Sequence, residues 1–558
     1  MTEIQERWWK ETIVYQIYPR SFKDSTGNGV GDLKGILNKV DYLEELGIET
    51  IWFSPFFVSP QGDHGYDIQD YKSIDPEYGT MKEFEDLRDE LHKRKMKIVL
   101  DLVLNHTSDQ HHWFLESSSS KDNPKRDWYI WKDGRKPNGK KPPNNWKAEI
   151  GGSAWRYFEN TDQWVYHQFL PFQPDLNYRN PEVKKEMFDI VKFWLNKGAD
   201  GFRLDIFHAI YEDKEFRDNP FTFQLLPSDE STSSFFQKRK YDVNQPETYE
   251  FAIELRNLID SYKPERFLVG EVFGTIPEIK KYYGPQNNGL NMIFLFKFTS
   301  TGFDADKFRT VISEIEKEFP KPYIPTYVLG NHDRMRYISR LKGDKEKAKI
   351  LATLQITLRG VPFIYYGEEI GMKNVKIKLK NSKDPIGRKF SWLPFSQIKS
   401  LGFALTRDGC RTPMQWDKNH NAGFSPNETI EPWLKIPSNY QHINVQTEKT
   451  DPNSLLNFYK SLIKIRRESP ALSRGEFEFL DILGINDKCL GYKRKSEEQT
   501  YMIYLNFTEK TLKIPISGSE NNLNLILSTD FERKNLDVLE NSYFELKKYE
   551  GVIIDKKK

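Results

Sequence analysis

The stretch GFRLDIFHAI at 201–210 places two charged residues, Arg203 and Asp205, inside a run of apolar residues that suits a buried strand. Burying a charge is costly unless a partner compensates it. Side chains two residues apart on a strand point to the same face, so these two could form a satisfied buried ion pair. They could equally belong to a polar site at the end of the strand, and the rest of the chain must decide.

Three other apolar runs end in charged or polar residues: DLVLNH at 101–106, VGEVF at 269–273 and LGNHD at 329–333. If these runs are parallel strands of one barrel, Asp205, Glu271 and Asp333 point at one pocket. Carboxylates that share a site raise the pKa of one of them, and glycoside hydrolysis needs such a neutral acid. A divalent metal site is the alternative, although the chain has no HxxxH or HxH spacing.

The elements that must position these residues alternate along the chain. Apolar runs predict strands at 13–22, 48–56, 96–106, 201–207, 266–273, 290–298, 324–333 and 361–371. Helical periodicity separates them at 33–47, 81–95, 181–198, 246–262 and 305–318, and Pro181 suits a first helical turn. Eight strands alternating with helices predict the α/β class and a (β/α)8 TIM barrel, whose functional residues gather at the carboxyl ends of the strands.

Two segments depart from this alternation. Residues 107–175 are rich in Ser, Lys, Asn, Pro and Trp, and predict an irregular subdomain inserted after the third strand. From 476 to 558 the pattern changes to short strands with turn signals, which predicts a small C-terminal antiparallel β domain. The barrel would then comprise residues 1–106 and 176–475, a division that suits a chain of 558 residues.

Composition narrows the classes of partner. The chain has 83 basic and 81 acidic residues and a net charge of +2, too balanced to favour nucleic acid or an anionic membrane. No window resembles a transmembrane helix, and the start lacks the pattern of a signal peptide. Cys410 and Cys489 are far apart, so we expect no disulfide framework, a buried apolar role for Cys410 and a cytoplasmic location.

At this point the chain resembles the α-amylase superfamily, glycoside hydrolase family 13, in its α-glucosidase and oligo-1,6-glucosidase branch. The resemblance covers most of the chain and rests on several short motifs in order: WWKETIVYQIYPRSF, GYDIQDY, DLVLNH, QPDLN, GFRLD, GEVF, GNHD and RTPMQWD. It implies a retaining mechanism in which Asp205 is the nucleophile, Glu271 the general acid/base and Asp333 the third acid. Arg203 would orient the nucleophile and keep it ionised.

The resemblance also implies contacts with a sugar. Tyr66 would be a stacking platform, and His106 and His332 would bind hydroxyl groups of the same sugar. Asp67 and Arg411 would form a pair that closes the pocket around a terminal glucose. No organic cofactor is implied, and the substrate would be a small oligosaccharide or disaccharide bound by a monomer or homodimer.

The loop DSTGNGVGD at 24–32 alternates oxygen-bearing residues with glycines and resembles a calcium loop. One structural calcium ion would be held by Asp24, Thr26, Asn28, the carbonyl of Val30 and Asp32. Relatives usually have Asn and Asp where this chain has Thr26 and Asn28. The alternative is a turn closed by hydrogen bonds from the backbone to side chains, with no metal.

The expected activity is that of an exo-acting α-glucosidase on short α-1,4- or α-1,6-linked glucosides. Within this branch, valine after the nucleophile accompanies α-1,6 preference, and this chain has Ile206, which leans toward that group. The loop at 212–245 looks more like that of α-1,4-acting relatives, so linkage stays open. A glucosyltransferase, a sucrose isomerase and a sucrose- or trehalose-active enzyme would use the same acids. A non-catalytic transporter-associated homologue is a remote alternative, because it would carry a membrane anchor and lack acids.

Overall fold

A computed structural model of the chain describes residues 8–226, 228, 230–393, 397–398, 403–482, 484–516, 523–537 and 543–556. Eight parallel strands form one sheet in the order β11-β10-β9-β5-β2-β1-β13-β12. They are β1 (Val14–Ile17), β2 (Thr50–Phe53), β5 (Lys97–Leu102), β9 (Gly201–Leu204), β10 (Phe267–Gly270), β11 (Met292–Ile293), β12 (Thr326–Val328) and β13 (Val361–Tyr365). Each of the eight predicted runs contains a strand of this sheet, which confirms the barrel class, although the run at 13–22 continues into α1 (Pro19–Phe22).

A side chain spans the position where the sheet closes. The hydroxyl of Thr326 on β12 accepts the N–H of Leu295 at 3.1 Å and donates to the carbonyl of Ile293 on β11 at 3.0 Å. The apolar run predicted as a strand at 290–298 is paired only over two residues, and α9 (Lys297–Ser300) begins within it. Its continuation is apolar because Phe294 and Phe296 pack into the barrel interior, not because it is a strand.

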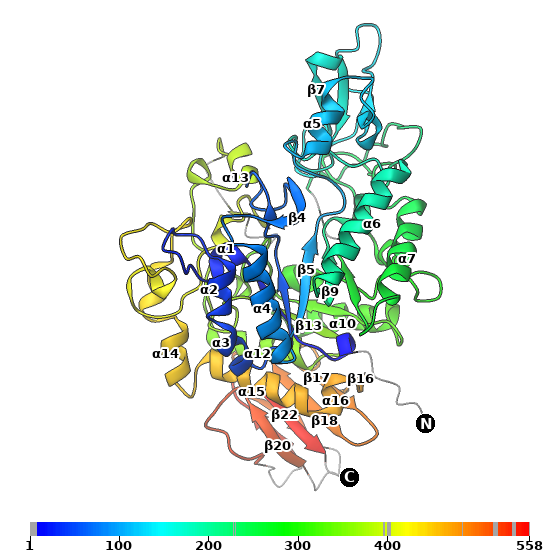
Figure 1. The fold of residues 1–558 in the computed structure, drawn as a ribbon. Helices are drawn as coiled ribbons and strands as arrows, with labels where there is room; N and C mark the ends of the chain where they lie inside the picture. Colours follow the sequence, from blue (N-terminus) through cyan, green and yellow to red (C-terminus); the bar gives the residue numbers. More distant parts are fainter. Residues whose placement is uncertain are drawn as a thin grey trace.

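Helices cover the outside of this sheet (Figure 1). They include α1 (Pro19–Phe22), α2 (Leu33–Leu37), α3 (Val40–Leu46), α4 (Met81–Lys93), α6 (Pro181–Asn196), α7 (Pro246–Asp260), α8 (Ile276–Lys281), α10 (Ala305–Glu318), α11 (Tyr337–Arg340) and α12 (Lys345–Thr357). The predicted single helix at 33–47 is two helices, because Lys39 leaves helical geometry at φ −119° and ψ 10°. Its predicted end at Gly47 is confirmed, where a left-handed φ of 88° suits glycine.

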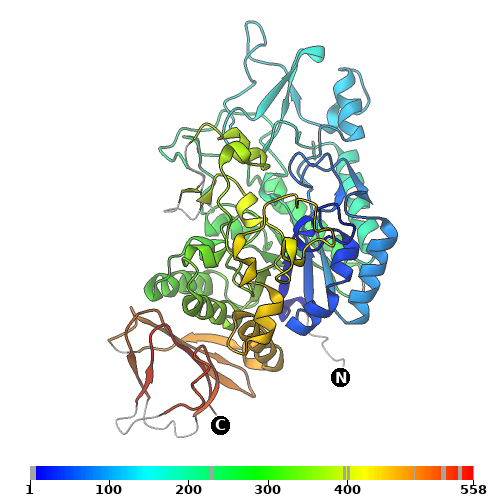
Figure 2. The ribbon, with the colours of Figure 1, turned by 90° about the vertical axis from the view of Figure 1, so that its left-hand side faces the viewer.

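Residues 107–175 contain α5 (His112–Ser119) and an antiparallel sheet in the order β6-β8-β7, formed by β6 (Trp131–Lys132), β8 (Gln163–Tyr166) and β7 (Trp155–Phe158). A short antiparallel pair, β3 (Phe57–Val58) and β4 (Asp70–Ile74), precedes this segment. Figures 1 and 2 place the segment at one end of the barrel and the C-terminal sheet at the opposite end. The predicted domain boundaries themselves stay predictions.

The chain after the barrel strands contains α13 (Pro385–Lys389), β14 (Gln397–Ile398), β15 (Phe403–Ala404), α14 (Val445–Thr450), α15 (Leu455–Glu468) and α16 (Pro470–Ser473). The C-terminal sheet has the order β16-β17-β18-β22-β20, with a separate pair β19-β21. These are β16 (Glu476–Phe479), β17 (Cys489–Lys495), β18 (Thr500–Asn506), β19 (Leu512–Pro515), β20 (Leu523–Ser528), β21 (Tyr543–Leu546) and β22 (Gly551–Lys556). The predicted antiparallel β character of this region is confirmed.

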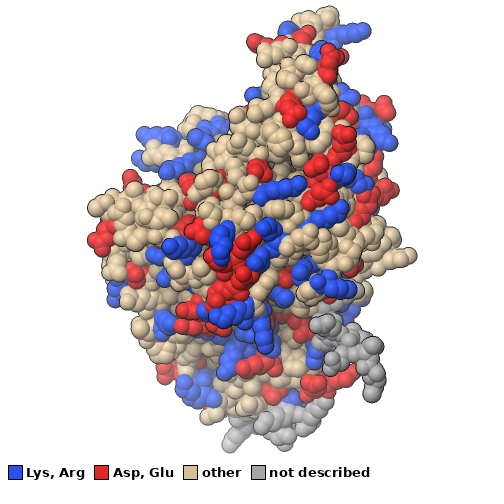
Figure 3. Space-filling view, viewed as in Figure 1, with Lys and Arg blue, Asp and Glu red and all other residues tan. Residues whose placement is uncertain are grey.

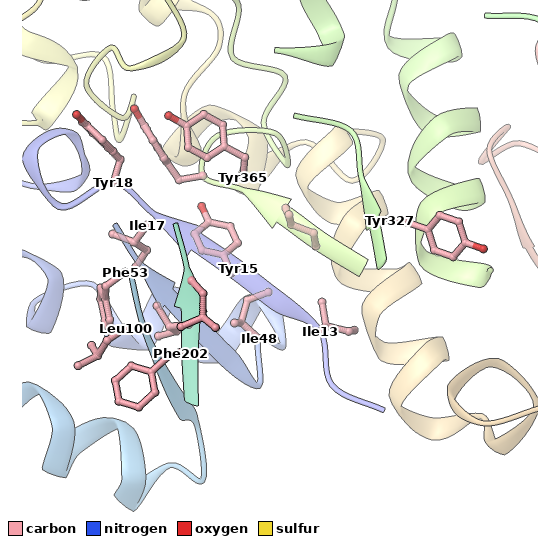
Figure 4. Close-up of a cluster of buried hydrophobic side chains, with 14 of the residues drawn as sticks. Ile13, Tyr15, Ile17, Tyr18, Ile48, Phe53, Leu100, Phe202, Tyr327 and Tyr365 are labelled. Atoms are coloured by element: carbon pink, nitrogen blue, oxygen red, sulfur yellow. The ribbon is translucent and has the colours of Figure 1, made fainter. Parts of the chain in front are cut away.

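The barrel strands are buried on both faces. Val14, Trp52 and Val99 belong to a cluster inside the barrel, whereas neighbouring residues such as Tyr15 face the larger cluster under the helices. Figure 4 shows part of that larger cluster, with side chains from β1, β2, β5 and β9. Burial on both faces fixes the positions of the strands. It therefore also fixes their carboxyl ends, from which the polar side chains project.

Charges on the outer surface are mixed. Lysine and arginine lie among aspartate and glutamate over the face shown in Figure 3, as expected from a net charge of +2. Among the helices that the structure describes, none combines the length and apolar character required to cross a membrane.

Candidate active site

Parallel pairing brings four charged residues together at the carboxyl end of the sheet. Arg203 on β9 lies opposite Asp101 on β5, and its strand also pairs with β10, which leads to Glu271. Its Nη1 donates to Asp101 at 2.8 Å and to Asp205 at 2.5 Å, while Nη2 donates to Glu271 at 2.6 Å. One buried guanidinium therefore joins three carboxyl groups from three neighbouring strands.

The backbone just after Asp205 turns sharply. Ile206 has a left-handed φ of 33°, which is strained for a β-branched residue. This turn lets the N–H of Ile206 donate to the Glu271 carboxylate at 3.3 Å and the N–H of Phe207 donate to the Glu271 carbonyl at 2.9 Å. The strain is thus associated with a backbone that ties Glu271 to the segment carrying Asp205.

Burial raises the pKa of all three carboxyl groups around Arg203, to about 6 for Asp101, about 7 for Asp205 and about 8 for Glu271, although Arg203 lowers each of them. One guanidinium cannot neutralise three carboxylates, so protonation within the cluster is favoured. The pKa is raised to the highest value at Glu271, which suits this residue to carry a proton. Arg203 lowers the pKa of Asp205, in the expected direction, although burial raises it more. The role of Arg203 in keeping the nucleophile ionised stays a prediction.

His332 and Asp333 follow β12, which lies beside β11 where the sheet closes. Burial lowers the pKa of His332 well below its ordinary value, so the ring is neutral. Its Nδ1 accepts from Gln16 at 2.8 Å, which leaves the hydrogen on Nε2, 3.0 Å from Asp333 and 2.6 Å from the hydroxyl of Tyr66. The hydroxyl of Tyr66 donates to Asp101 at 2.9 Å, and its ring stacks on His332. Tyr66, His332 and Asp333 are therefore connected to the Arg203 cluster.

His106 is buried beside this network, and its Nε2 lies 3.2 Å from the carbonyl of Tyr66. Burial lowers its pKa to about 4, so it is neutral and able to exchange hydrogen bonds with a hydroxyl group.

Cys410 is also buried, as predicted, and its thiol donates to the carbonyls of His332 and Arg407.

The expected contact between Asp67 and Arg411 is not formed. Asp67 accepts the hydroxyl of Ser59 and the N–H groups of Gly62 and Asp63, all within its own loop. Arg411 donates instead to Asp333 at 2.8 Å and to the carbonyl of His332 at 2.8 Å. The sequence has another aspartate and another arginine four residues before these two, Asp63 and Arg407, and it does not show which of them form the pair.

An aspartate–arginine pair is formed instead by Asp63 and Arg407. Nη2 of Arg407 lies 2.5 Å from Asp63, and Nη1 lies 3.4 Å from Asp333. Burial alone would raise the pKa of Asp333, but His332, Arg411 and Arg407 lower it well below its ordinary value.

Four residues of this network are not among the site residues that the sequence predicts: Asp63, Asp101, Arg407 and Gln16. Asp63 and Arg407 each lie four residues before a predicted one, which is the only signal that could have suggested them.

The loop at 24–32 lies apart from this network. The side-chain oxygens of Asp24, Asn28 and Asp32 accept main-chain N–H groups, from Thr26, Gly27, Gly29, Val30 and Gly35. Thr26 uses its hydroxyl as a donor to Asp24. These oxygens are therefore engaged in the hydrogen bonds of a turn, which was the alternative to a calcium loop. The calcium ion stays a prediction.

The metal alternative for the catalytic centre gains no support. In the part of the chain that the structure describes, no three His, Cys, Asp or Glu side chains are grouped so that they could hold a metal ion. Carboxyl groups bridged by arginine at the mouth of a (β/α)8 barrel instead define an enzyme of acid/base and nucleophilic chemistry.

Comparison with known proteins agrees with this class. Residues 16–475 match the family model described as "Alpha amylase, catalytic domain". The chain belongs to this family and is a glycoside hydrolase. It is 42% identical over 533 residues to the oligo-1,6-glucosidase of Heyndrickxia coagulans, covering 90% of this chain and 93% of that protein.

Other relatives carry different names. The chain is 36% identical to the trehalose-6-phosphate hydrolase of Bacillus subtilis strain 168, over 98% of each protein. A solved structure described as an α-glucosyl transfer enzyme, XgtA, is 33% identical and superposes with a TM-score of 0.87 over 99% of both chains. The family is thus established, while its members differ in substrate and in reaction.

Proposed function

We propose that the protein is a retaining, exo-acting α-glucosidase that removes terminal glucose from short α-linked oligosaccharides or disaccharides. The observation that carries the proposal is the bridge formed by Arg203 between Asp205 and Glu271. Two carboxyl groups bound to one guanidinium favour the short separation of roughly 5–5.5 Å that a retaining mechanism uses. The family and the glucosidase names of the relatives support the same reaction class.

In this mechanism the two carboxyl groups have different tasks. Asp205 attacks the anomeric carbon while Glu271 gives its proton to the leaving oxygen, so the glycosidic bond breaks as a covalent glucosyl ester forms. Glu271 then removes a proton from water, which attacks the anomeric carbon and releases Asp205. The raised pKa of Glu271, about 8, suits the first step at neutral pH.

The other buried groups would bind the glucose that is transferred. Asp333, kept ionised by its cationic neighbours, is suited to accept hydrogen bonds from sugar hydroxyls. Arg407 and Asp63 offer a donor and an acceptor on the same side of the pocket as Asp333. His106 and Tyr66 lie on the side of Asp101. Side chains that surround a single glucose favour cleavage at the end of a sugar chain over cleavage within a long chain.

We propose α-1,6 as the preferred linkage. The relatives named oligo-1,6-glucosidase support this preference, and so does β-branched Ile206, which follows the nucleophile. Glucosyl transfer is the second candidate, favoured by the structural likeness to the α-glucosyl transfer enzyme. The two candidates use the same acids and differ in whether water or another sugar accepts the glucosyl group.

The test is glucose release from isomaltose, maltose, sucrose, trehalose and trehalose-6-phosphate, with Glu271→Gln as the control. We expect fastest release from isomaltose, formation of the α-anomer of glucose when followed by NMR, and a loss of about 10²–10⁴-fold in the variant. β-Glucose as the first product would overturn the retaining mechanism. New disaccharides in place of free glucose would move the assignment to glucosyl transfer.

A further inference from the structure

Arg407 is shared among three carboxylates that come from different parts of the chain. Its guanidinium contacts Asp63 at 2.5 Å, Asp384 at 2.8 Å and Asp333 at 3.4 Å. Arginine carries a long and flexible side chain, so its aim in a pocket depends on what restrains it. The side chain of Asp333 is 27% exposed, whereas those of Asp63 and Asp384 are almost completely buried, so Asp333 lies on the open side of the guanidinium. Asp384 belongs to the segment 382–389.

Asp384 restrains Arg407 at three positions. It is fully buried and accepts the main-chain N–H of Arg407 at 2.6 Å, Nε at 3.1 Å and Nη2 at 2.8 Å. The contacts at Nε and Nη2 form the bidentate arrangement in which carboxylate and guanidinium are coplanar. They fix the plane of the guanidinium and leave Nη1 directed at Asp333.

Asp384 is in turn held in place by its own segment. Asp408 accepts the hydroxyl of Ser382 at 2.8 Å and the N–H groups of Lys383 at 2.8 Å and Asp384 at 3.1 Å. Asp384 also caps α13 through the N–H of Ile386 at 3.1 Å.

The far end of α13 reaches the inserted segment. Lys389 donates to the carbonyl of Ile150 at 3.1 Å and also to that of Gly151. The segment 382–389 therefore connects the guanidinium of Arg407 with residues 107–175.

We infer that Asp384 is a positioning residue that aims Arg407 across the pocket at the terminal glucose, and so sets how tightly the non-reducing end is held. The inference rests on the proposed function, in which Arg407 contacts that glucose. Asp384 itself is enclosed behind the guanidinium and acts through it. Asp384 contacts Arg407, for which no bond to Asp205 or Glu271 is seen, so loss of this contact weakens binding more than it slows the chemical steps.

The first test compares Asp384→Asn with Lys389→Met, using 4-nitrophenyl α-glucoside as substrate and glucose as competitive inhibitor. Lys389→Met removes the contacts of the same segment with the carbonyls of Ile150 and Gly151 but leaves the ion pair between Asp384 and Arg407. We expect Asp384→Asn to raise KM and the glucose inhibition constant together by about tenfold or more, with kcat within about threefold, as for loss of a charge-assisted contact. Lys389→Met should leave both constants within about twofold. An equal rise in both variants would overturn the inference, because loosening of the segment would then explain it.

A double-mutant cycle with Arg407→Lys provides the second test. If Asp384 acts through the guanidinium, Asp384→Asn should change KM by less than about twofold when lysine replaces Arg407. Full additivity of the two changes would overturn the inference. Failure of the proposed function gives a different result: Arg407→Lys alone would then leave KM and glucose inhibition unchanged. Asp384→Glu, which retains the charge, should recover part of the affinity.

Discussion

Two of the regions that bury arginines use them differently. At the carboxyl end of the barrel, Arg203 donates to the carboxyl groups of Asp101, Asp205 and Glu271. At the junction with the C-terminal sheet, Arg466 donates to the carbonyls of Ile356 at 2.6 Å and Leu358 at 3.1 Å, and also to that of Gly360. Arg494 donates there to the carbonyls of Thr357 and Gly475. Both regions exclude water from a cation, but only the first supplies ionised partners.

The physical consequence appears in the pKa values. Burial lowers the pKa of Arg466 to about 10 and that of Arg494 to about 9, because carbonyl groups compensate only part of the lost hydration. Burial opposes the charge of Arg203 too, but three carboxyl groups raise its pKa well above the ordinary value. α12 ends at Thr357, so the carbonyls at the junction include the unpaired groups of a helix terminus.

This comparison shows that a buried charge does not by itself indicate a functional site. Arg466 and Arg494 join two parts of the fold by satisfying main-chain groups that folding leaves unpaired. Arg203 holds carboxyl groups, which can act as a nucleophile, accept a proton or bind a hydroxyl group. Between these two regions, the nature of the partner distinguishes the arginines that join main-chain groups from the one at the candidate site.

The largest expected effect comes from changing Arg203. Lysine has one point charge and cannot bridge three carboxyl groups, so Arg203→Lys should lower kcat/KM by roughly 10²–10⁴-fold. The matched control is Arg466→Lys, which should leave kcat/KM of the folded enzyme within about twofold. Steady-state kinetics on folded protein, checked by circular dichroism, measures both. A similar loss of activity in the two variants would contradict the distinction drawn here.

The carboxyl cluster should also give the enzyme a narrow pH profile. In the proposed mechanism Asp205 must be ionised, and its pKa is raised to about 7, so activity should fall as pH drops through that value. Glu271 must be protonated in the same mechanism, and its pKa is raised to about 8, so activity should fall as pH rises through that value. The pH dependence of kcat/KM checks this. An alkaline limb that persists unchanged in Glu271→Gln would show that another group causes it.

At the junction, the expected effect falls on stability. Arg466→Met removes donors to three buried carbonyls, and an unsatisfied buried group costs about 1–3 kcal/mol. We expect a loss of roughly 2–4 kcal/mol in the free energy of unfolding, seen as a lower denaturant midpoint, with KM unchanged at 25 °C. An unchanged midpoint would show that methionine packing compensates the lost hydrogen bonds.

The smallest expected effect concerns the loop at 24–32, where carboxylates are satisfied by main-chain N–H groups and not by arginine. Since Asp24 and Asp32 already accept these donors, a chelator should shift Tm by less than about 2 °C. Thermal unfolding with EGTA and with added calcium measures this shift. A large stabilisation by calcium would establish the ion that the sequence predicts.

Much of the fold followed from short-range patterns. Alternating apolar runs and helical periodicity predicted eight strands, and Gly47 and Pro181 marked helix ends, because these signals depend on neighbours in the sequence. The same patterns overextended the strand at 290–298, since apolar residues that line the barrel interior resemble a strand until the sheet ends. They also missed the break between α2 and α3.

For the site, the sequence alone determined that Asp205, Glu271 and Asp333 lie at strand ends and therefore at one mouth of the barrel. Only the tertiary structure decided which charges meet there. Asp63 and Arg407 are 344 residues apart. The sequence does not distinguish them from Asp67 and Arg411, which lie four residues further along the chain. Such pairs form when barrel closure brings distant loops together, and a difference of four residues in a loop is invisible to local propensity. The shared bridge of Arg203 has the same origin, because it depends on the register of three strands that the sequence does not specify.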